Sequence, residues 1–387
     1  MKNLIVYIGL LLSVQLVAQP LPRITPEKAG IDSRHLQYAD EVILQAIASR
    51  EMPGAVLAVV SKNRMAYLKA YGNRQIYPSI LPMEVNTVFD MASVSKSMST
   101  AISVMILVER GKLRLIDRVN IFIPEFQGNI RVIDLLTHCS GLPPYAQIDS
   151  LKARYGFPNP EGLINYISTC KRDFEPRTVF QYSCLNYITL QRIVETVSGQ
   201  SLKDFAKANI FDVLGMKHTC YQPEGETLER VAPTEKQPDG SVLHGVVHDP
   251  LARVMNGGIS GNAGVFSDAD DLAILSVALL NGGSYKGKRI LSPQGVRVMT
   301  AIPESLKQFG RSPGWDLSSD YASNKGDLFS FYAYGHTGYT GTSIVIDPEN
   351  KIAVILLANR VHPNDDGNMV RLRSMVANAV AASIRKL

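Results

Sequence analysis

Two polar residues three positions apart give the most specific chemical signal in this sequence. Ser93 and Lys96 come just before an apolar pattern of helical period. Residues i and i+3 share one face of a helix, so the Lys96 amine can lie beside the Ser93 hydroxyl. A hydroxyl at a helix N-terminus also lies where backbone N–H groups and the helix dipole stabilise an oxyanion. The pair indicates a serine nucleophile with a lysine base, although the spacing alone also fits an N-cap serine followed by a solvated lysine.

Two further segments could complete such a site. Tyr182 precedes a second helical pattern, and a neighbouring lysine can lower the pKa of a tyrosine enough for it to act as a base. His336, Thr337 and Gly338 precede a β-branched run, where small residues let an edge strand approach a substrate backbone closely. Together with the serine–lysine pair, these segments predict nucleophilic attack on a carbonyl.

In this order, the three segments resemble the Ser-x-x-Lys, Tyr-x-Asn and Lys/His-Thr-Gly motifs of an active-site-serine family. That family contains class C β-lactamases, low-molecular-mass penicillin-binding proteins and their esterase relatives. The resemblance extends from about Ile24 to Ile384 and is strongest to a branch of periplasmic D-alanyl-D-alanine carboxypeptidase-like proteins. The flanking segments that carry this likeness are Leu135–Pro143, His248–Pro250, Gly257-Gly258, Gly264–Ser267 and Asn359–Pro363.

The resemblance implies a covalent acyl-enzyme mechanism that needs no metal or organic cofactor. Ser93 would attack a carbonyl while Lys96 and Tyr182 pass its proton. The N–H groups of Ser93 and Tyr339 would form the oxyanion hole, and His336 would orient the Tyr182 hydroxyl or the substrate. The other positions expected to contact substrate are Thr337, Gly338 and Cys184.

The sequence departs from the family pattern at three positions. Cys184 replaces the asparagine of Tyr-x-Asn, and so removes an amide that holds the acylamino group of the substrate in this family. His336 replaces the lysine of most β-lactamases, and a largely neutral histidine attracts a substrate carboxylate less strongly. Asn262 stands where the branch often has a histidine. These departures argue against efficient degradation of β-lactams.

Cysteine positions raise a separate expectation. Cys139 stands where the family commonly has threonine, and Cys184 where it has asparagine, in two turns at the rim of the family's active site. We therefore expect a Cys139–Cys184 disulfide in an exported protein, with a small buried Cys184 thiol as the alternative. Pairing with Cys170 or Cys220 also stays open. The sequence contains no CxxC and no HExxH, so no metal site is predicted.

The remaining histidines have less specific surroundings. His138 is interpreted as a packing and capping residue. His248 and Asp249 form either a catalytic dyad or a hydrogen-bonded pair that fixes a loop, and the second interpretation is preferred. The histidines without any partner pattern are expected to be structural or on the surface: His218, His244 and His362.

Composition and charge exclude other classes of protein. Of the 387 residues, 45% are hydrophobic and 19% are charged, which suits a packed core and disfavours long disorder. The net charge is +5 and the basic residues form no long run, so a nucleic-acid partner is not expected. Lys2, the apolar stretch Leu4–Val17 and Ala18 predict a signal peptide over residues 1–18. The mature protein is expected to be periplasmic or secreted, without a membrane span.

Strands are expected near both ends of the chain, with helices between them. The expected strands lie within Pro53–Tyr71, Ser343–Asp347 and Ile352–Ala358. The expected helices are Ser93–Arg110, Ile133–His138, Gly162–Thr169, Leu185–Ser198 and Met369–Ile384. The pattern predicts an α/β (α+β) fold in which residues 23–96 and 251–387 form one antiparallel sheet region and residues 97–250 form an inserted helical region. The family resemblance adds that this is the β-lactamase/transpeptidase-like fold.

The function expected from these observations is hydrolysis of an amide or ester through Ser93. The substrate would be a small molecule or a cell-wall peptide, with D-Ala-D-Ala carboxypeptidase activity preferred. A carboxylesterase or weak β-lactamase is the enzymatic alternative, and a non-hydrolytic penicillin-binding sensor is the alternative from another class. The complete set of Ser93, Lys96, Tyr182 and His336 favours an enzyme.

Overall fold

A large antiparallel sheet built from both ends of the chain is the centre of the molecule. The computed structural model describes residues 20–319, 321 and 324–385, so the predicted signal peptide lies outside the described residues. The eight strands run in the order β3-β2-β1-β13-β12-β11-β10-β9. Their bounds are β1 Gly54–Ser61, β2 Arg64–Gln75, β3 Leu81–Pro82, β9 Arg311–Ser312, β10 Trp315–Asp316, β11 Tyr334–Thr337, β12 Ser343–Asp347 and β13 Ile352–Ala358.

The central strands alternate between two apolar cores. Side chains on a strand point to opposite faces in turn. In β1, Val56 and Val60 belong to one core, whereas Leu57 and Val59 belong to the other. The same alternation holds in β13, which pairs antiparallel with β1. Both faces of the sheet are therefore covered, and this explains why the sequences of these strands are continuously apolar.

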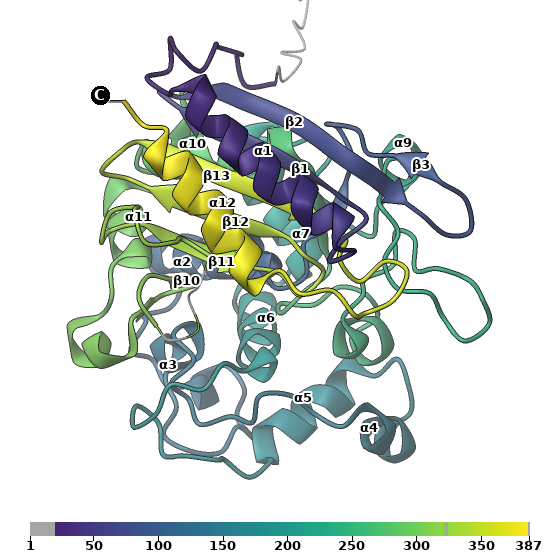
Figure 1. Cartoon of the computed structure of the whole chain (residues 1–387). Helices are drawn as coiled ribbons and strands as arrows, with labels where there is room; N and C mark the ends of the chain where they lie inside the picture. Colours follow the sequence, from purple (N-terminus) through teal and green to yellow (C-terminus); the bar gives the residue numbers. More distant parts are fainter. Residues whose placement is uncertain (1–19, 320, 322–323, 386–387) are drawn as a thin grey trace, which may run out of the picture.

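Two terminal helices cover one face of the sheet. Helix α1 (Ser33–Ala48) and helix α12 (Val370–Ala382) lie side by side on that face, as Figure 1 shows in purple and yellow. Asp32 caps α1 by accepting a hydrogen bond from the Arg34 N–H at 3.0 Å. The apolar faces of both helices pack into the second core.

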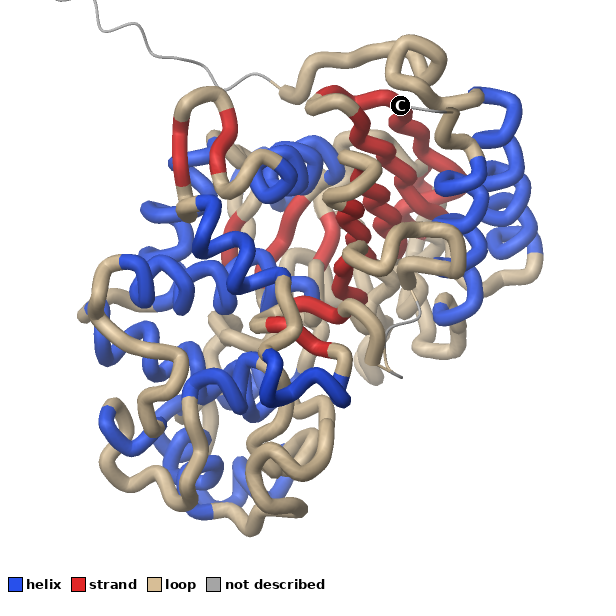
Figure 2. Tube along the Cα trace, turned by 90° about the vertical axis from the view of Figure 1, so that its left-hand side faces the viewer, coloured by secondary structure: helices blue, strands red, loops and turns tan. Residues whose placement is uncertain are grey.

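The opposite face carries the remaining helices, and Figure 2 shows them as a thick layer on the far side of the sheet from α1 and α12. Helix α10 (Ala269–Leu280) packs directly against β1 and β13. The other helical segments are η1 Lys96–Ala101, α2 Ile102–Glu109, η2 Val119–Ile121, α3 Val132–Leu136, α4 Ile148–Tyr155, α5 Pro160–Thr169, α6 Cys184–Ser198, α7 Leu202–Ala206, η3 Lys207–Phe211, α8 Asp212–Leu214, α9 Gly225–Glu229, η4 Leu251–Met255, α11 Pro293–Thr300 and η5 Glu304–Phe309. Short strands pair as β4 (Phe89–Asp90), β6 (Val265–Ser267) and β5 (Cys220–Tyr221), and as β7 (Ser284–Tyr285) with β8 (Lys288–Arg289).

These elements confirm the predicted fold class. The C-terminal strands end where the sequence pattern places them, and α6 ends at Gly199, which adopts a left-handed φ of 70°. The predicted helix after Ser93 is divided: a π-helical turn, η1, precedes the regular helix α2. Among the described residues, no helix is both long and apolar enough to span a bilayer.

Candidate active site

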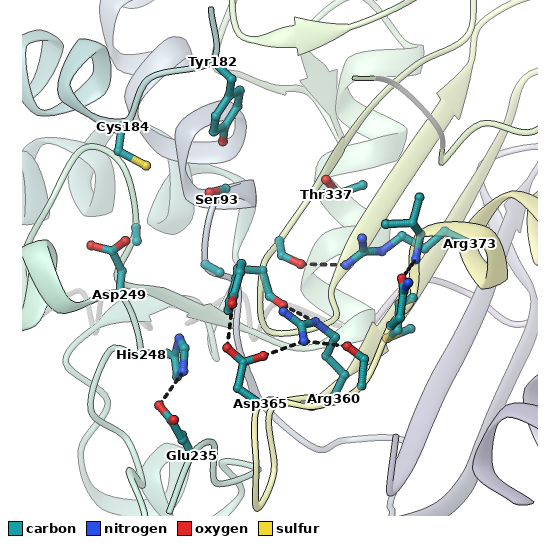
Figure 3. A pocket seen from close by; sticks show the side chains of 18 of the residues that line it. Ser93, Tyr182, Cys184, Glu235, His248, Asp249, Thr337, Arg360, Asp365 and Arg373 are labelled. Carbon is teal, nitrogen blue, oxygen red and sulfur yellow. Dashed lines mark hydrogen bonds and ion pairs between the residues drawn. The ribbon is translucent and has the colours of Figure 1, made fainter. Parts of the chain in front are cut away.

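A cavity of about 820 Å³ opens beside the end of the sheet where β11 lies. Ser93 and Tyr182 line it, with Cys184 close by and Arg373 across from them (Figure 3). The positions predicted to contact the substrate or to form the oxyanion hole all line the cavity: Cys184, Thr337, Gly338 and Tyr339. Lys96 and His336 are buried and do not line the cavity, and Lys96 contacts Ser93 from the protein interior. The structure therefore brings together residues from four distant parts of the sequence.

Ser93 lies on a tight turn between β4 and η1. Ala92, the residue before it, has a φ of +45°, a conformation that costs a residue with a side chain about 1–2 kcal/mol. The buried Asp90 carboxylate holds the turn by accepting hydrogen bonds from the Ala92 N–H at 2.8 Å and the His248 N–H at 2.7 Å. Burial raises the pKa of Asp90, while these two hydrogen bonds act in the opposite direction. The strain presents Ser93 to the cavity.

The neighbouring serines are not exposed to the cavity. Ser95 is buried and its hydroxyl accepts a hydrogen bond from the Val265 N–H at 3.1 Å. Ser97 is also buried and donates to the Gly314 carbonyl at 2.5 Å. Only Ser93 of this group lines the cavity among the described residues, which agrees with its selection by the lysine spacing.

Lys96 is held directly against the Ser93 hydroxyl. The Lys96 Nζ is 2.9 Å from Ser93 Oγ and 2.8 Å from the Asn262 carbonyl oxygen. Its side chain is fully buried and forms no ion pair within the described chain. The π-helical turn places it there, as such turns often do at functional sites. Lys96 is thus positioned to accept the Ser93 proton.

Tyr182 is fixed by aromatic stacking. Its ring stacks on His138 with centroids 4.4 Å apart and on Tyr321 with centroids 4.6 Å apart. Loss of solvent raises the pKa of the Tyr182 hydroxyl, and its hydrogen bond with Ser93 lowers that pKa by less. This direction is opposite to the lowered pKa expected from the neighbouring lysine. Tyr182 is therefore a neutral hydroxyl in the resting site, able to relay a proton but not to start as a phenolate.

The expected Cys139–Cys184 disulfide is wrong in this structure, in which all four cysteines are free. Cys139 is fully buried and its thiol donates to the Thr137 carbonyl at 3.4 Å. The Cys184 sulfur instead lies 3.6 Å from Lys96 Nζ at the cavity wall. The small-thiol alternative for Cys184 therefore holds.

Hydrogen bonds join the two turns that the disulfide was expected to link. His138 Nδ1 accepts from the Ser183 N–H at 3.1 Å, and the Gln181 N–H donates to the His138 carbonyl at 2.9 Å. The Cys184 N–H donates to the Pro144 carbonyl at 2.9 Å. The packing and capping role predicted for His138 agrees with these contacts.

His336 does not take the position expected of it. It is 3% exposed and is not among the residues that line the large cavity. Its Nδ1–H donates to the Thr337 carbonyl at 2.8 Å, and its ring centroid is 6.2 Å from that of Tyr182. Burial lowers the pKa of His336 well below its usual value. His336 is therefore a neutral positioning residue beneath Thr337.

The buried His336 has a consequence for stability against acid. The unfolded chain binds a proton at this histidine near pH 6.5, whereas the folded protein does not, so stability is lost as the pH falls below 6.5. This residue contributes a slope of up to about 1.4 kcal/mol per pH unit to the free energy of unfolding. His336→Asn, which keeps a donor toward Thr337, should flatten the slope between pH 6.5 and 5.

Urea denaturation of both proteins at several pH values measures this difference directly. The other titratable groups are common to the two proteins, so their contributions cancel in the comparison. Parallel curves of unfolding free energy against pH for wild type and His336→Asn would show that His336 is not buried as a neutral group.

Ser93 and Tyr339, whose N–H groups are predicted to form the oxyanion hole, both line the cavity. Within the described residues, neither the Ser93 N–H nor the Tyr339 N–H donates to another group. Gly338, between Thr337 and Tyr339, admits no side chain: an added Cβ would lie 2.1 Å from Thr342 Oγ1. The Arg360 Nε–H donates to the Tyr339 carbonyl at 2.8 Å and so orients that peptide. Both amides are therefore available to a substrate oxygen, and the oxyanion hole implied by the family resemblance stays a prediction.

Two charged residues of the cavity have places that the sequence did not predict: Arg373 was not singled out, and Asp249 was expected to pair with His248. Arg373 is buried on α12, where its guanidinium donates to the Gly338 carbonyl at 2.7 Å and its Nε has no partner among the described residues. Asp249 lines the wall near Cys184. A signal for Arg373 existed: it lies beside Leu372 and one turn before Val376 and Ala377, on the buried apolar stripe of the last helix. A charged residue in such a stripe is unusual unless its charge is used.

His248 and Asp249 do not pair with each other. His248 Nε2 is 3.2 Å from a Glu235 oxygen. Asp249 accepts from the Ala252 N–H at 2.8 Å and the Tyr145 hydroxyl at 3.2 Å. Both the proposed dyad and the proposed direct hydrogen bond are therefore wrong, although each residue fixes its loop separately.

The other histidines have structural partners. His244 Nε2 is 3.1 Å from the Val231 carbonyl oxygen, and His362 Nε2 accepts from the Ile76 N–H at 3.0 Å. His218 lies 2.9 Å from Asp268, and with Asp271 these residues form the group in the described chain whose spacing could suit a cation. Their oxygens and nitrogens already serve in internal hydrogen bonds, and they do not line the cavity.

A buried lysine lies 2.9 Å from a cavity-facing serine that follows the strained Ala92, beside an antiparallel sheet, and this is the arrangement of an active-site-serine hydrolase. Residues 39–378 match the family described as Beta-lactamase, and the chain belongs to that family.

Individual relatives extend over most of the chain. A protein of Escherichia coli K12 named "Putative D-alanyl-D-alanine carboxypeptidase" is 32% identical, over 94% of this chain and 92% of its own. An N-acetylmuramyl-L-alanine amidase of Bacillus subtilis is also 32% identical, over 88% of this chain and 84% of its own. Among solved structures, the penicillin-binding protein homologue of Pyrococcus abyssi has a TM-score of 0.69 and 25% identity, over 90% of this chain and 78% of its own. The hydrolase EstCE1 shares the fold, with a TM-score of 0.70, 22% identity and coverage of 90% and 99%.

Proposed function

We propose that this hydrolase removes a C-terminal D-amino acid from a small, peptidoglycan-derived peptide through an acyl-enzyme at Ser93. The observation that carries the substrate assignment is Arg373, a guanidinium at the cavity wall that has no carboxylate partner in the described chain. Burial lowers the pKa of Arg373 to about 10, so it remains charged at neutral pH. A buried charge without a partner is costly, and a substrate carboxylate would offset that cost.

The bond that breaks follows from the position of Arg373 relative to Ser93. Arg373 binds the carbonyl of Gly338, next to the proposed oxyanion amide of Tyr339. A peptide whose last carboxylate pairs with Arg373 would place the preceding peptide carbonyl over Ser93 and the two amides. This is the bond that a carboxypeptidase cleaves, and relatives carry that name.

Protons then move along groups that are already in contact. Ser93 loses its proton to Lys96 and attacks the carbonyl, whose oxygen takes the negative charge beneath the two amides. Tyr182, as a neutral hydroxyl, gives its proton to the leaving amine and takes the proton that Lys96 received from Ser93, and the C-terminal residue departs as a free amine. Water then attacks the ester carbonyl and gives one proton to Lys96. The bond between Ser93 Oγ and the carbonyl carbon breaks, and Ser93 takes that proton back, which restores the free enzyme. The proposed export of the chain would bring it to the compartment that contains such peptides.

The assay compares two peptides that differ only at the C-terminus: one ending in D-Ala-D-Ala with a free carboxylate, and the same peptide as a C-terminal amide. We expect the wild type to prefer the free carboxylate at least about tenfold in kcat/KM. Arg373→Gln should remove the preference, whereas Arg373→Lys should retain part of it. Equal cleavage of both peptides by the wild type would contradict the proposal, and exclusive cleavage of neutral esters would favour a carboxylesterase.

A further inference from the structure

The Asp249 carboxylate is a second charge in the cavity without a counter-ion. It is partly exposed and lines the same cavity as Ser93. Its oxygens accept hydrogen bonds from the Ala252 N–H at 2.8 Å and the Tyr145 hydroxyl at 3.2 Å, and across the described residues it forms no ion pair. A carboxylate offers about four acceptor positions, so two hydrogen bonds leave capacity for a ligand.

Asp249 and Arg373 lie on opposite sides of the nucleophile. Figure 3 shows Asp249 and Cys184 on one side of Ser93 and Arg373 on the other. If the leaving group's carboxylate occupies the Arg373 side, the acyl part of the substrate extends toward Asp249. The cavity thus offers a positive charge to one end of a substrate and a negative charge to the other.

The surroundings of Asp249 suit a cation better than a neutral amide. The residue next to it in the cavity is a cysteine, Cys184, whose thiol is a weak hydrogen-bonding group. The aromatic ring of Tyr145, whose hydroxyl binds Asp249, lines the same part of the wall, and aromatic faces attract ammonium groups. Burial is the main cause of the raised pKa values of Tyr182 and Cys184, and the Asp249 charge acts in the same direction on both. Its field therefore reaches the catalytic groups.

We propose that Asp249 binds a primary ammonium group on the acyl part of the substrate, so that the preferred substrate is a peptide with a free amine on that side and a free carboxylate on the other. This inference rests on the proposed function for the direction in which the substrate lies. Asp249 is a specificity-determining residue, and it takes no part in proton transfer. Hydrogen bonds from charged donors to carboxylates correspond to roughly 10–100-fold in binding.

The test uses a matched pair of substrates. One is a lysyl-D-Ala-D-Ala tripeptide whose two amines are free, and the other is the same tripeptide with both amines acetylated. We expect the wild type to prefer the free amines at least about tenfold in kcat/KM. Asp249→Asn keeps the size of the side chain and an oxygen for the Ala252 N–H, and should lower kcat/KM for the free-amine tripeptide to near that of the acetylated one.

Two controls separate specificity from a general loss of structure. Asp212→Asn makes the same charge change on a distant surface, where Asp212 pairs with Lys207, and should retain the preference. Thermal unfolding and the rate of fluorophosphonate labelling report whether Asp249→Asn is folded with a reactive serine. If Asp249→Asn lowered kcat/KM equally for both tripeptides, Asp249 would have a structural role and the inference would be overturned. A wild-type preference for the acetylated tripeptide would also overturn it.

A second pair of probes distinguishes this inference from the proposed function. These probes are the p-nitrophenyl esters of D-alanine and of N-acetyl-D-alanine, which lack the C-terminal carboxylate. A preference for the free amine on the esters that disappears in Asp249→Asn, with neither tripeptide cleaved, would support the ammonium site and refute the carboxypeptidase. Cleavage of both tripeptides without any charge preference would support the carboxypeptidase and overturn the ammonium site.

Discussion

Ser93→Ala should lower kcat/KM for every hydrolysed substrate by about 10⁴-fold or more, because no other cavity-facing hydroxyl lies in contact with Lys96 in the described chain. The substitution removes one oxygen from a partly exposed position, so the melting temperature should change little. Steady-state kinetics on a short-chain ester and on a D-Ala-D-Ala peptide, with thermal unfolding of the same sample, measure both effects.

If the Ser93→Ala protein kept an activity within about tenfold of the wild type, the nucleophile would be another side chain. Tyr182 and Cys184 are nucleophilic side chains that line the same cavity as Ser93. The double variants Ser93→Ala/Cys184→Ser and Ser93→Ala/Tyr182→Phe would then identify which of them carries the remaining activity.

Lys96→Met should lower the rate of acylation by about 10³-fold. Methionine fills a similar volume but cannot accept the Ser93 proton, and the amine is the basic group within hydrogen-bond distance of Ser93 Oγ. Stopped-flow measurement of the first turnover with a p-nitrophenyl ester isolates the acylation step from deacylation. Substrate affinity should change much less than the rate, since Lys96 lies behind Ser93 and not on the cavity wall.

The stability of the Lys96→Met protein provides the control. Removing a buried amine that has no ion-pair partner among the described residues should not unfold the chain, although the Asn262 carbonyl loses its hydrogen bond. A fully folded Lys96→Met protein that acylates within about fivefold of the wild-type rate would exclude Lys96 as the base. In that case the proton would have to leave through Tyr182 alone.

The main elements of the fold could be predicted because their signals are local. The strands β12 and β13 are β-branched runs joined by a turn, and their bounds in the structure match the pattern. Helix α6 follows a capping serine and ends at a glycine. The π-helical turn η1 could not be predicted, because it depends on the contacts that Lys96 makes with residues from elsewhere in the chain.

The site was predictable where spacing along one helix determines the contact. Ser93 and Lys96 are three residues apart, and their side chains meet as that spacing requires. The orientation of a side chain in a turn is not determined by the sequence of the turn alone. Cys139 and Cys184 belong to neighbouring turns that His138 joins. Their thiols nevertheless contact different partners, because the orientation of each side chain depends on the packing around it.

Arg373 was missed, and Asp249 was assigned the wrong partner, because the contacts of both residues are tertiary. Arg373 meets Gly338 across 35 positions of sequence, and Asp249 meets Tyr145 across 104. His336 was identified by its motif, but the depth at which it is buried, and so the direction of its pKa shift, depends on packing around β11. Such effects become visible only when the elements are assembled.

Ser93 should form a covalent intermediate with the substrate, and mass spectrometry can detect such an intermediate on the intact protein. Wild-type protein is incubated with a fluorophosphonate and, separately, with a β-lactam, and its intact mass is recorded before the adduct is located by peptide mapping. We expect one adduct per chain, located on Ser93 and absent in Ser93→Ala. An adduct on Ser95 or Cys184, or labelling of Ser93→Ala to the same extent as the wild type, would contradict it.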